Sequence, residues 1–412
     1  MKKKILVRGP ILSQSGYGEQ SRFALRALKS REDIFDVFIQ AIPWGQTGWV
    51  WEQNEFRRWI DERVRVTQVM ISQEQLQPEI SLQITIPNEW QKICAINIGY
   101  TAGIETTMVA PQWLEKGNQM DKILVVSTHA KTTYENTKAQ AKNPQTGEII
   151  PYALETPIDV VWETTPLTPS ETINELSLDY DFNFLCVSQM GPRKNFENTI
   201  RWFVEEFIDQ EVGLVIKTSI KSNSTIDFQQ TIHGLKAVLS NYPDRKCKVY
   251  LLHGDLSGGQ MTSLYTNEKI KAIINIAHGE GFGLPLYEAA RNGLPIVTIG
   301  WSGQLDFLHH NNQNYFQETD YTLQAIQKEA VWDGVLDSDS KWAYADQGSF
   351  KMALRKTRKN WDSCKKTATE LQGIIQEKFN EEALYKGFVD AILGFDSSLI
   401  EPNKDEVVLE FD

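Results

Sequence analysis

Long apolar runs are missing from this sequence. No stretch approaches the ~18 apolar residues that a membrane-spanning helix needs, so we expect no transmembrane segment. Cysteine is also scarce, and the thiols are scattered, with no CxxC pair and no closely placed histidine, at Cys94, Cys186, Cys247 and Cys364. This spacing excludes a zinc or disulfide scaffold and is typical of a protein from the reducing cytoplasm.

The chain opens with a basic stretch, MKKKILVRGP, whose apolar part ends after three residues. A secretory signal needs a longer apolar segment, so we expect a first β-strand here instead. The formal net charge of −12 disfavours a general nucleic-acid binder, because phosphate contacts require cations. The run 349–366 is a local exception, with seven Lys or Arg on an expected helix. Either a solvated helix face or a phosphate-tracking surface accounts for it.

Strand-like apolar segments alternate with helical segments in two series along the 412 residues. The first series has expected strands at 4–10, 35–42, 79–86, 95–102 and 122–128. The second has expected strands at 182–190, 213–219, 247–254, 272–277 and 294–300. Such alternation predicts parallel sheets covered by helices, and therefore an α/β fold with two Rossmann-like domains.

A stretch rich in Pro, Thr and Ser, residues 155–179, separates the two series. We therefore predict an N-terminal domain over 1–165, a second domain over 180–375, and a C-terminal helix with an acidic tail over 376–412. Open parallel sheets bind ligands at the carboxyl ends of their strands, so two such sheets facing each other predict a cleft.

The segment 278–298, HGEGFGLPLYEAARNGLPIVT, carries the strongest signal. An apolar, strand-like run precedes it, and Pro285 suits the first turn of a following helix because its missing N–H costs nothing there. Glycines let the backbone approach a ligand closely, while the free amides and dipole of a helix N-terminus attract negative charge. The segment therefore predicts an anion site.

Two carboxylates, Glu280 and Glu288, flank this loop with seven residues between them. Two negative side chains beside an anion site are contradictory for a simple anion but not for a nucleotide sugar. Its diphosphate requires amides and cations, while its hydroxyls require acceptors such as carboxylates. The string EGFGLPLYE closely resembles the E-x7-E signature of the retaining glycosyltransferases of family 4, which have the GT-B fold. The alternative is an ordinary glycine turn with two surface glutamates.

The resemblance implies that Glu280 is catalytic and accepts from sugar hydroxyls, and that Glu288 accepts from the ribose diol. The loop residues Gly281, Phe282, Gly283 and Leu284 line the same donor site. A retaining hydrolase would instead need two carboxyls about 5 Å apart across the scissile bond.

Arg193 and Lys194 follow the first strand of the second series, before a helix whose expected N-cap is Asn195. Two cations there suit a diphosphate leaving group. The run resembles the PRKN element of the family, in which a Lys and a nearby Arg bind the donor phosphates. Gln189 stands where the commoner version of the motif has Arg, so Arg193 is the expected substitute.

The N-terminal half carries weaker signals. SGYGE lacks the third glycine of a dinucleotide fingerprint. The family resemblance places Gly16 and Gly18 near the donor phosphates. It also matches Glu105 and His129 to positions after two later strands, where Glu105 would orient the acceptor and His129 would contact the donor sugar. For His129 and His278, a supporting role in packing is the alternative.

The resemblance as a whole implies a GT-B retaining glycosyltransferase with its donor mainly in the second domain and its acceptor in the first. The C-terminal helix would return to the N-terminal domain. Cations at the phosphates imply no metal cofactor, and we interpret the DxD runs at 179–181 and 337–339 as structural. The acceptor stays open between a glycan, a lipid-linked saccharide, a protein and a hydroxymethylated DNA base. A nucleotide-sugar-binding protein without activity and a sugar-nucleotide epimerase are the rival functions.

Overall fold

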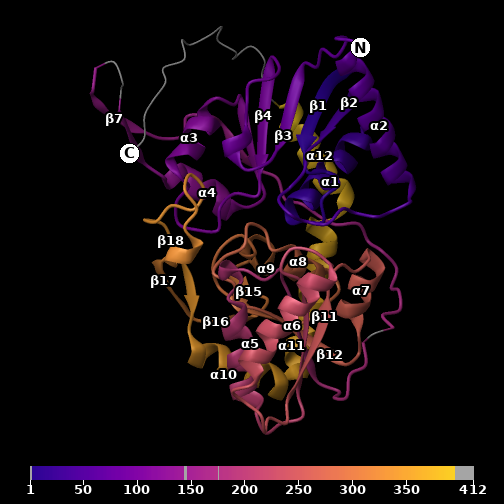
Figure 1. The fold of residues 1–412 in the computed structure, drawn as a ribbon, viewed down its shortest axis with the longest axis vertical. Coiled ribbons are helices and arrows are strands. Elements are labelled where there is room, and N and C mark those ends of the chain that lie inside the picture. Colours follow the sequence, from indigo (N-terminus) through magenta and orange to yellow (C-terminus); the bar gives the residue numbers. More distant parts are fainter. Residues whose placement is uncertain (1, 143–145, 175, 395–412) are drawn as a thin grey trace. The chain divides into compact units, whose positions relative to one another are not determined.

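The computed structural model describes residues 2–142, 146–174 and 176–394. The chain divides into two compact units. Unit 1 comprises Met1–Glu163, Val331–Ser340 and Glu381–Asp412, and unit 2 comprises Thr164–Ala330 and Lys341–Asn380. Each unit holds one large parallel sheet with its own helices, so the predicted α/β class is confirmed (Figure 1).

The sheet of unit 1 has six parallel strands in the order β2-β1-β3-β4-β5-β8. They are β1 (Lys3–Gly9), β2 (Phe35–Ala41), β3 (Ile80–Ile84), β4 (Ile96–Thr101), β5 (Lys122–Val125) and β8 (Ile158–Val160). A hairpin of β6 (Ala139–Lys142) and β7 (Ile149–Tyr152) lies apart from it. Every residue of β3 and β5 is buried, as expected for parallel strands covered on both faces.

Three of the helices described in unit 1 begin where a polar side chain bonds a free amide. They are α1 (Gly16–Lys29), α2 (Glu55–Ser72), α3 (Pro111–Asn118), α4 (Thr128–Asn136) and α12 (Glu381–Leu393), with a 3-10 turn at η1 (Pro87–Glu89). Ser15, Asn54 and Ser127 each accept a hydrogen bond from an amide in the first turn of α1, α2 and α4. These caps set the starts of three helices at the carboxyl ends of strands or loops.

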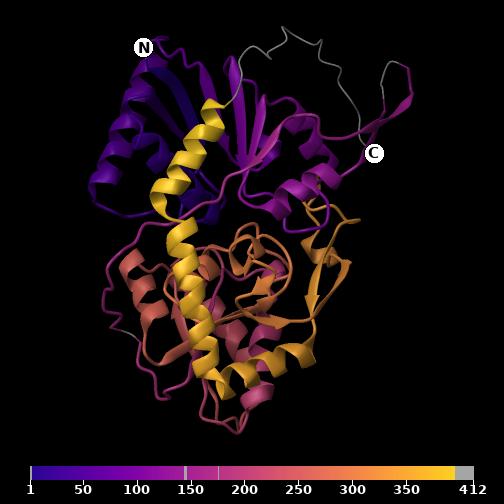
Figure 2. The same cartoon turned by 180° about the vertical axis from the view of Figure 1, so that it is seen from behind.

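The last described helix, α12, packs on unit 1 (Figure 2). The Phe388 ring is fully buried, 5.6 Å from the ring of Phe23 in α1 and 5.5 Å from that of Tyr100 in β4. The Lys122 ammonium donates a 2.8 Å hydrogen bond to the carbonyl of Ala391. Residues of α12 therefore complete the core of unit 1, which also contains β1 and α1 from the beginning of the sequence.

Val331–Ser340 is a second return to unit 1. Val335 joins the apolar cluster around Trp113, and the Gly334 carbonyl accepts a 2.8 Å hydrogen bond from Asn88. Gly334 has a φ of +68°, and a Cβ there would lie 2.4 Å from the Gln112 side chain. Only glycine suits both demands. This excursion is not predicted by the sequence pattern, because the segment is polar and short.

The sheet of unit 2 also has six parallel strands, in the order β11-β10-β9-β12-β13-β16. They are β9 (Asn183–Val187), β10 (Gly213–Thr218), β11 (Lys248–His253), β12 (Ile270–Asn275), β13 (Ile296–Ile299) and β16 (Gln317–Thr319). Two small antiparallel pairs are added, β14 (His309–His310) with β15 (Gln313–Asn314) and β17 (Tyr321–Ala325) with β18 (Lys341–Ala345).

The helices of unit 2 are α5 (Phe196–Phe207), α6 (Thr225–Leu239), α7 (Gly258–Thr266), α8 (Leu284–Arg291), α9 (Leu305–Leu308), α10 (Gln347–Lys359) and α11 (Trp361–Lys378), with 3-10 turns at η2 (Pro192–Lys194) and η3 (Lys328–Ala330). Helix α5 carries the core: Phe203 and Phe207 pack on Phe184 of β9. This places the start of α5 at the carboxyl end of a central strand.

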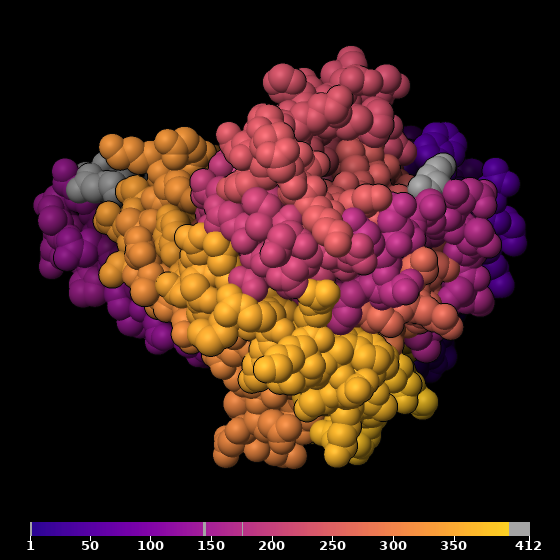
Figure 3. Space-filling view, turned by 90° about the horizontal axis from the view of Figure 1, so that it is seen from below, coloured from indigo at the N-terminus to yellow at the C-terminus, as the bar shows by residue number. Residues whose placement is uncertain are grey.

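The single basic helix expected over 349–366 is wrong. Asn360 leaves the helical conformation and separates α10 from α11, whose outer surfaces are yellow in Figure 3. Two of the cations pair with acids of α5: Lys351 lies 2.5 Å from Glu205 and Arg355 lies 2.6 Å from Glu206. These charges hold α10 against α5, which accounts for part of the basic run without a phosphate ligand.

The sequence has no long apolar run and few cysteines, from which we expect no transmembrane segment and no disulfide scaffold. Within the described ranges, no helix is both long and apolar enough to cross a membrane. All four cysteines are free thiols, and burial raises the pKa of Cys186 to about 11.

We predict that Phe388→Ala destabilises unit 1 by about 3–5 kcal/mol, because it opens a cavity between α1, β4 and α12. Hydrogen exchange should show the loss in β1 and β4 amides. Lys386→Ala on the exposed side of α12 is the matched control and should change stability by less than about 0.5 kcal/mol. Equal exchange in both variants would mean that α12 does not support the core of unit 1.

Candidate functional site

The glycine loop lies between β12 and α8 in unit 2, and a second loop holds it in place. The Glu280 amide donates to Ser302 Oγ at 2.9 Å, and the Gly303 amide donates to the Glu280 carbonyl at 2.9 Å. A Cβ on Gly303 would lie 1.8 Å from the Gly281 carbonyl oxygen, so the two loops touch through glycine backbone. The loop after β13 thus fixes the loop after β12.

Gly283 forms the junction between this loop and α8. Its φ of +93° is a left-handed conformation that favours glycine. Its carbonyl accepts from the amides of Leu286 and Tyr287, while Leu284 and Pro285 begin the helix. The positive end of the α8 dipole therefore lies beside Gly281 and Phe282, as the sequence pattern predicts.

Glu280 is buried and surrounded by donors. Lys194 Nζ lies 2.7 Å from both carboxylate oxygens, Arg193 Nη1 lies 3.1 Å from Oε2, and Asn275 Nδ2 donates to Oε1 at 2.9 Å. Burial raises the pKa of Glu280, but the charges of Lys194 and Arg193 outweigh it and lower the pKa to about 2. The carboxyl is therefore ionised at neutral pH.

The loop that carries Arg193 and Lys194 follows β9, the neighbour of β12 in the sheet. Arg193 donates to the Gly279 carbonyl at 2.5 Å, and its own carbonyl accepts from the His278 amide at 2.8 Å. The structure thus brings together Arg193, Lys194 and Glu280, which are far apart in the sequence.

Asn195 starts α5 but does not cap it with its side chain, contrary to the expectation. It has a φ of +51°, and its Nδ2 donates to the Ile276 carbonyl at 3.2 Å. Its Oδ1 accepts from Asn198 at 2.7 Å. The side chain therefore ties the loop after β9 to the loop after β12.

Glu288 lies in the middle of α8 and faces two hydroxyls. Tyr265 donates to Oε2 at 2.8 Å, and Thr165 donates to Oε1 at 3.2 Å. Burial raises the pKa of Tyr265, and Glu288 raises it further.

His278 is a supporting residue in this structure. Its ring stacks on Trp342 with 4.8 Å between centroids, and its Nδ1 lies 2.6 Å from the Ala343 carbonyl. Burial lowers the pKa of His278, so the ring is neutral at physiological pH. These contacts attach the glycine loop to β18.

The predicted residues of unit 1 gather at the carboxyl ends of β1, β4 and β5. Tyr17, between Gly16 and Gly18, bonds Thr101 of β4 through hydroxyls 2.7 Å apart. Burial raises the pKa of Tyr17, and Glu105 is among the charges that raise it further. Glu105 therefore lies near the loop that holds Gly16.

His129 belongs to the same group in unit 1. Burial lowers the pKa of His129 to about 4, against hydrogen bonds with the backbone of Thr106 and Ile104 on either side of Glu105. The imidazole is neutral at physiological pH. Gly18 has a packing reason of its own, because a Cβ there would lie 2.0 Å from the Ser13 carbonyl oxygen, whereas a Cβ on Gly16 would meet nothing within 4 Å.

Several residues of the unit 2 site are not predicted from the sequence. Asn275 and Ser302 hold Glu280, and Tyr265 holds Glu288. Lys217, near the end of β10, is half-buried; burial lowers its pKa, while Asp255 and Glu288 act to raise it. In the sequence, the only feature that marks Lys217 as a candidate site residue is its position at the end of an expected strand.

The DxD runs make local contacts. Asp179 lies 3.0 Å from Lys248 and accepts from Tyr250, and Asp337 accepts from the Asp339 amide at 2.8 Å. In the part of the chain that the structure describes, no three His, Cys, Asp or Glu side chains are grouped as metal ligands.

We expect the ion cluster to make the stability of unit 2 depend on acid pH. The pKa of Glu280 is lowered from 4.5 to about 2, so its contribution is complete above about pH 5 and is lost as the pH falls towards 2. At pH 7 Glu280→Gln should cost about 3 kcal/mol. Urea unfolding at several pH values measures this. The variant should lose less stability than the wild type between pH 5 and 2, while exposed Glu268→Gln should behave as the wild type; parallel curves for Glu280→Gln would contradict the assignment.

Comparison with known proteins adds a partial sequence match. No protein-family model matches the chain. A stretch of 118 residues is 30% identical to the serotype-specific mannosyltransferase WbdA of Escherichia coli, and it covers 28% of this chain and 13% of that protein. A second WbdA sequence from E. coli matches at 31% over 116 residues, with the same coverage. The match thus spans about an eighth of the length of these relatives.

Solved structures match nearly the whole chain. Sucrose-phosphate synthase from Thermosynechococcus elongatus aligns with a TM-score of 0.62 at 12% identity, over 95% of this chain and 99% of that one. A glycosyltransferase from Rickettsia africae aligns with a TM-score of 0.60 at 10% identity, over 96% and 98%. A structure described as trehalose-6-phosphate from E. coli bound with UDP-2-fluoro glucose aligns with a TM-score of 0.55 at 11% identity, over 97% and 100%. The chain therefore has the fold of the GT-B glycosyltransferases.

Proposed function

We propose that this protein is a retaining glycosyltransferase that moves a sugar from a nucleotide diphosphate sugar to a hydroxyl acceptor. One observation carries the proposal: an ionised, buried Glu280 held by Lys194 and Arg193 at the start of α8. Cations, helix amides and acceptor oxygens meet there, which is the mixture of groups that a nucleotide sugar requires.

The phosphate end of the donor would bind to the cations and the α8 N-terminus. Lys194 and Arg193 place two positive charges in the loop after β9, where they already hold Glu280 and could also attract a diphosphate. Negative charge grows on the diphosphate as the glycosidic bond breaks, and fixed positive groups stabilise that charge in the transition state. These groups supply the charge that a metal ion would otherwise bring, so we propose that no metal is required.

The hydroxyl groups of the donor would bind to the two glutamates. With a pKa of about 2, Glu280 cannot be the proton donor of a glycoside hydrolase, which needs a raised pKa. Its acceptor positions already face Lys194, Arg193 and Asn275, so a sugar hydroxyl would donate to Glu280 in place of one of these contacts. Glu288 would accept from the ribose diol beside Tyr265, with Lys217 nearby to balance its charge.

The transfer step that fits these groups uses one face of the sugar. The bond between the anomeric carbon and the diphosphate oxygen breaks, and the acceptor oxygen bonds to that carbon on the same face. The acceptor proton passes to the departing phosphate oxygen. We assign acceptor binding to unit 1, where Glu105 would orient the acceptor hydroxyl and neutral His129 would bond the donor sugar.

The named relatives guide the choice of ligands. WbdA is a mannosyltransferase, and one solved structure of this fold is bound with UDP-2-fluoro glucose, so mannosyl and glucosyl donors come first. The free, scattered thiols suit the cytoplasm as the place of action.

A thermal-shift series with nucleoside diphosphate sugars tests the donor site. A donor present at about 100 times its Kd should stabilise the wild type by about 2.7 kcal/mol. Glu288→Ala should bind the same donor at least about tenfold more weakly, because it loses a charged hydrogen bond to the ribose. Exposed Glu268→Ala is the control. Equal responses of Glu288→Ala and the wild type would refute the role of Glu288.

Substitution of Lys194 tests the role of the cations. Lys194→Met should lower kcat/KM by about 10²–10³-fold, measured as release of nucleoside diphosphate, because the leaving group loses a fixed charge. Lys351→Met removes a cation of α10 and should release product at the wild-type rate. Undiminished release from Lys194→Met, once circular dichroism shows it folded, would contradict the proposed role.

The rival functions give different products. A protein that only binds would be stabilised by a donor but would release no nucleoside diphosphate with any acceptor. An epimerase would convert the donor sugar without an acceptor, which proton NMR of the mixture would show. Transfer with the opposite anomeric configuration would contradict the retaining course alone.

A further inference from the structure

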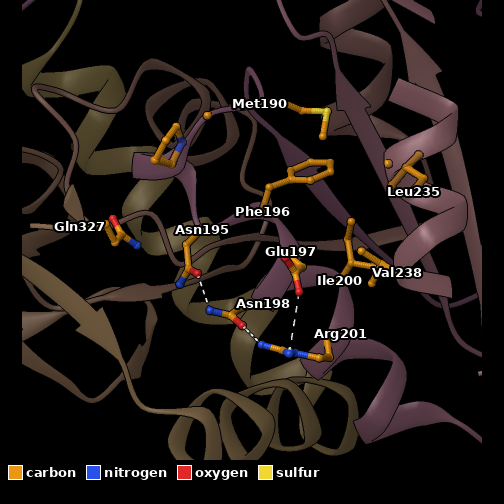
Figure 4. Close-up of a pocket in the computed structure, with 13 residues that line it drawn as sticks. Met190, Asn195, Phe196, Glu197, Asn198, Ile200, Arg201, Leu235, Val238 and Gln327 are labelled. Carbon is orange, nitrogen blue, oxygen red and sulfur yellow. Dashed lines mark hydrogen bonds and ion pairs between the residues drawn. The ribbon is translucent and has the colours of Figure 1, made fainter. Parts of the chain in front are cut away.

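Unit 2 contains a cavity lined by Gly191, Pro192 and Asn195, which flank Arg193 and Lys194 in the loop after β9. It has a volume of about 540 Å³ and lies between that loop, the first turns of α5, and α6 (Figure 4). Such a volume is within the roughly 300–1,000 Å³ range of small-molecule sites. Gly191, Pro192 and Glu197 line it and are exposed, so it opens to solvent. We call it the α5–α6 pocket.

The α5–α6 pocket has one apolar side and one polar side. Phe196, Leu235 and Val238 belong to the apolar side in Figure 4. Along the polar side, Asn198 donates to Asn195 at 2.7 Å and accepts from Arg201. An aromatic and aliphatic surface facing amide and guanidinium groups suits a ligand with C–H faces and hydroxyl edges.

The charges of the pocket favour a neutral ligand. Its lining includes one cation and one anion, Arg201 and Glu197, which lie 3.8 Å apart. A phosphate or carboxylate would meet Glu197, and an ammonium ion would meet Arg201. A polyol uses both, because each hydroxyl donates and accepts.

Gly234 adds an independent observation. It lies inside α6, where glycine costs about 1 kcal/mol relative to alanine. A Cβ there would meet only the tip of Met190, at 3.9 Å, so packing does not require the glycine. The missing side chain leaves this part of the pocket open.

We propose that the α5–α6 pocket binds a neutral saccharide unit, separately from the nucleotide-sugar donor. The proposal that this unit belongs to an acceptor or product glycan rests on the proposed glycosyltransferase function. Within that function, the pocket would hold part of a glycan chain on unit 2 through successive transfers.

The pocket is connected to the donor site through two polar side chains. Asn195 bonds the Ile276 carbonyl, four residues before Glu280. Gln327 lies 3.3 Å from His278 Nε2, and its buried Oε1 has no hydrogen-bond partner among the described residues. A saccharide that contacts Asn195 and Gln327 would therefore change the free energy of the donor loops, and donor binding would change saccharide affinity by the same factor.

The test fills the pocket without touching the donor site. Gly234→Leu places a side chain in the cavity and raises the helix propensity of α6. Gly373→Leu, in α11 where a Cβ meets nothing within 4 Å, is the matched control. Asn198→Ala removes polar groups without filling the space. Saturation-transfer NMR and calorimetry would measure binding of α-linked mannobiose, maltose and cellobiose to the full chain.

We expect at least one disaccharide to bind the wild type and Gly373→Leu equally, and both pocket variants at least about tenfold more weakly. All three variants should keep the thermal shift with the nucleotide sugar. Undiminished disaccharide binding by Gly234→Leu, or no disaccharide binding to a wild type that binds its nucleotide sugar, would overturn the pocket proposal. If the wild type binds no nucleotide sugar, the proposed function is overturned instead. In that case, disaccharide binding that is weakened only in the two pocket variants would still support the pocket proposal.

Discussion

The buried contact between Glu280 and the cations Lys194 and Arg193 is the interaction on which the candidate site depends. Removing a carboxylate from water costs several kcal/mol, which only good geometry and added hydrogen bonds can offset. Lys194 and Asn275 provide these within 2.9 Å, so the folded protein keeps the charge ionised. The contact joins the loops after β9 and β12, which are neighbours at the centre of the sheet. Binding groups from distant parts of the sequence are therefore set in place before any ligand arrives.

Under the proposed function, this organisation reduces the cost of binding a nucleotide sugar. Ser302 and Gly303 each form a hydrogen bond with the backbone of Glu280 and so fix the glycine loop. Gly283 forms the left-handed turn that precedes α8. Fixed dipoles and charges need little rearrangement when charge develops on a leaving group, which is how such sites stabilise a transition state. The ion cluster, the glycine contacts and the start of α8 thus have one physical effect. They fix the orientation of polar groups, whereas water dipoles in the same place would have to reorient as charge develops.

Much of this could be predicted from the sequence because its signals are local. Alternating apolar segments predict both parallel sheets, and the segment around Glu280 predicts the strand, turn and helix start that the structure has. Contacts made by tertiary packing carried no such signal. Val331–Ser340 returns to unit 1 through single contacts such as that of Gly334 with Asn88, and Lys217 approaches Glu288 only because β10 lies beside β9. The break at Asn360 was not predicted, although the residues that follow it, Trp361–Cys364, have lower helix propensity than the basic run before it.

Asn195 shows why residue identity matters more than backbone conformation alone. A φ of +51° is open to glycine at no cost, yet glycine would lose the bonds to Ile276 and Asn198. Most other side chains would be strained there, and aspartate, which tolerates the turn, could not donate to the Ile276 carbonyl. Asparagine alone satisfies the turn and both hydrogen bonds, one towards the donor loop and one towards the α5–α6 pocket. Because the same side chain contacts the loop after β12 and lines the pocket, a ligand in the pocket that moves Asn195 would also act on the loop that carries Glu280.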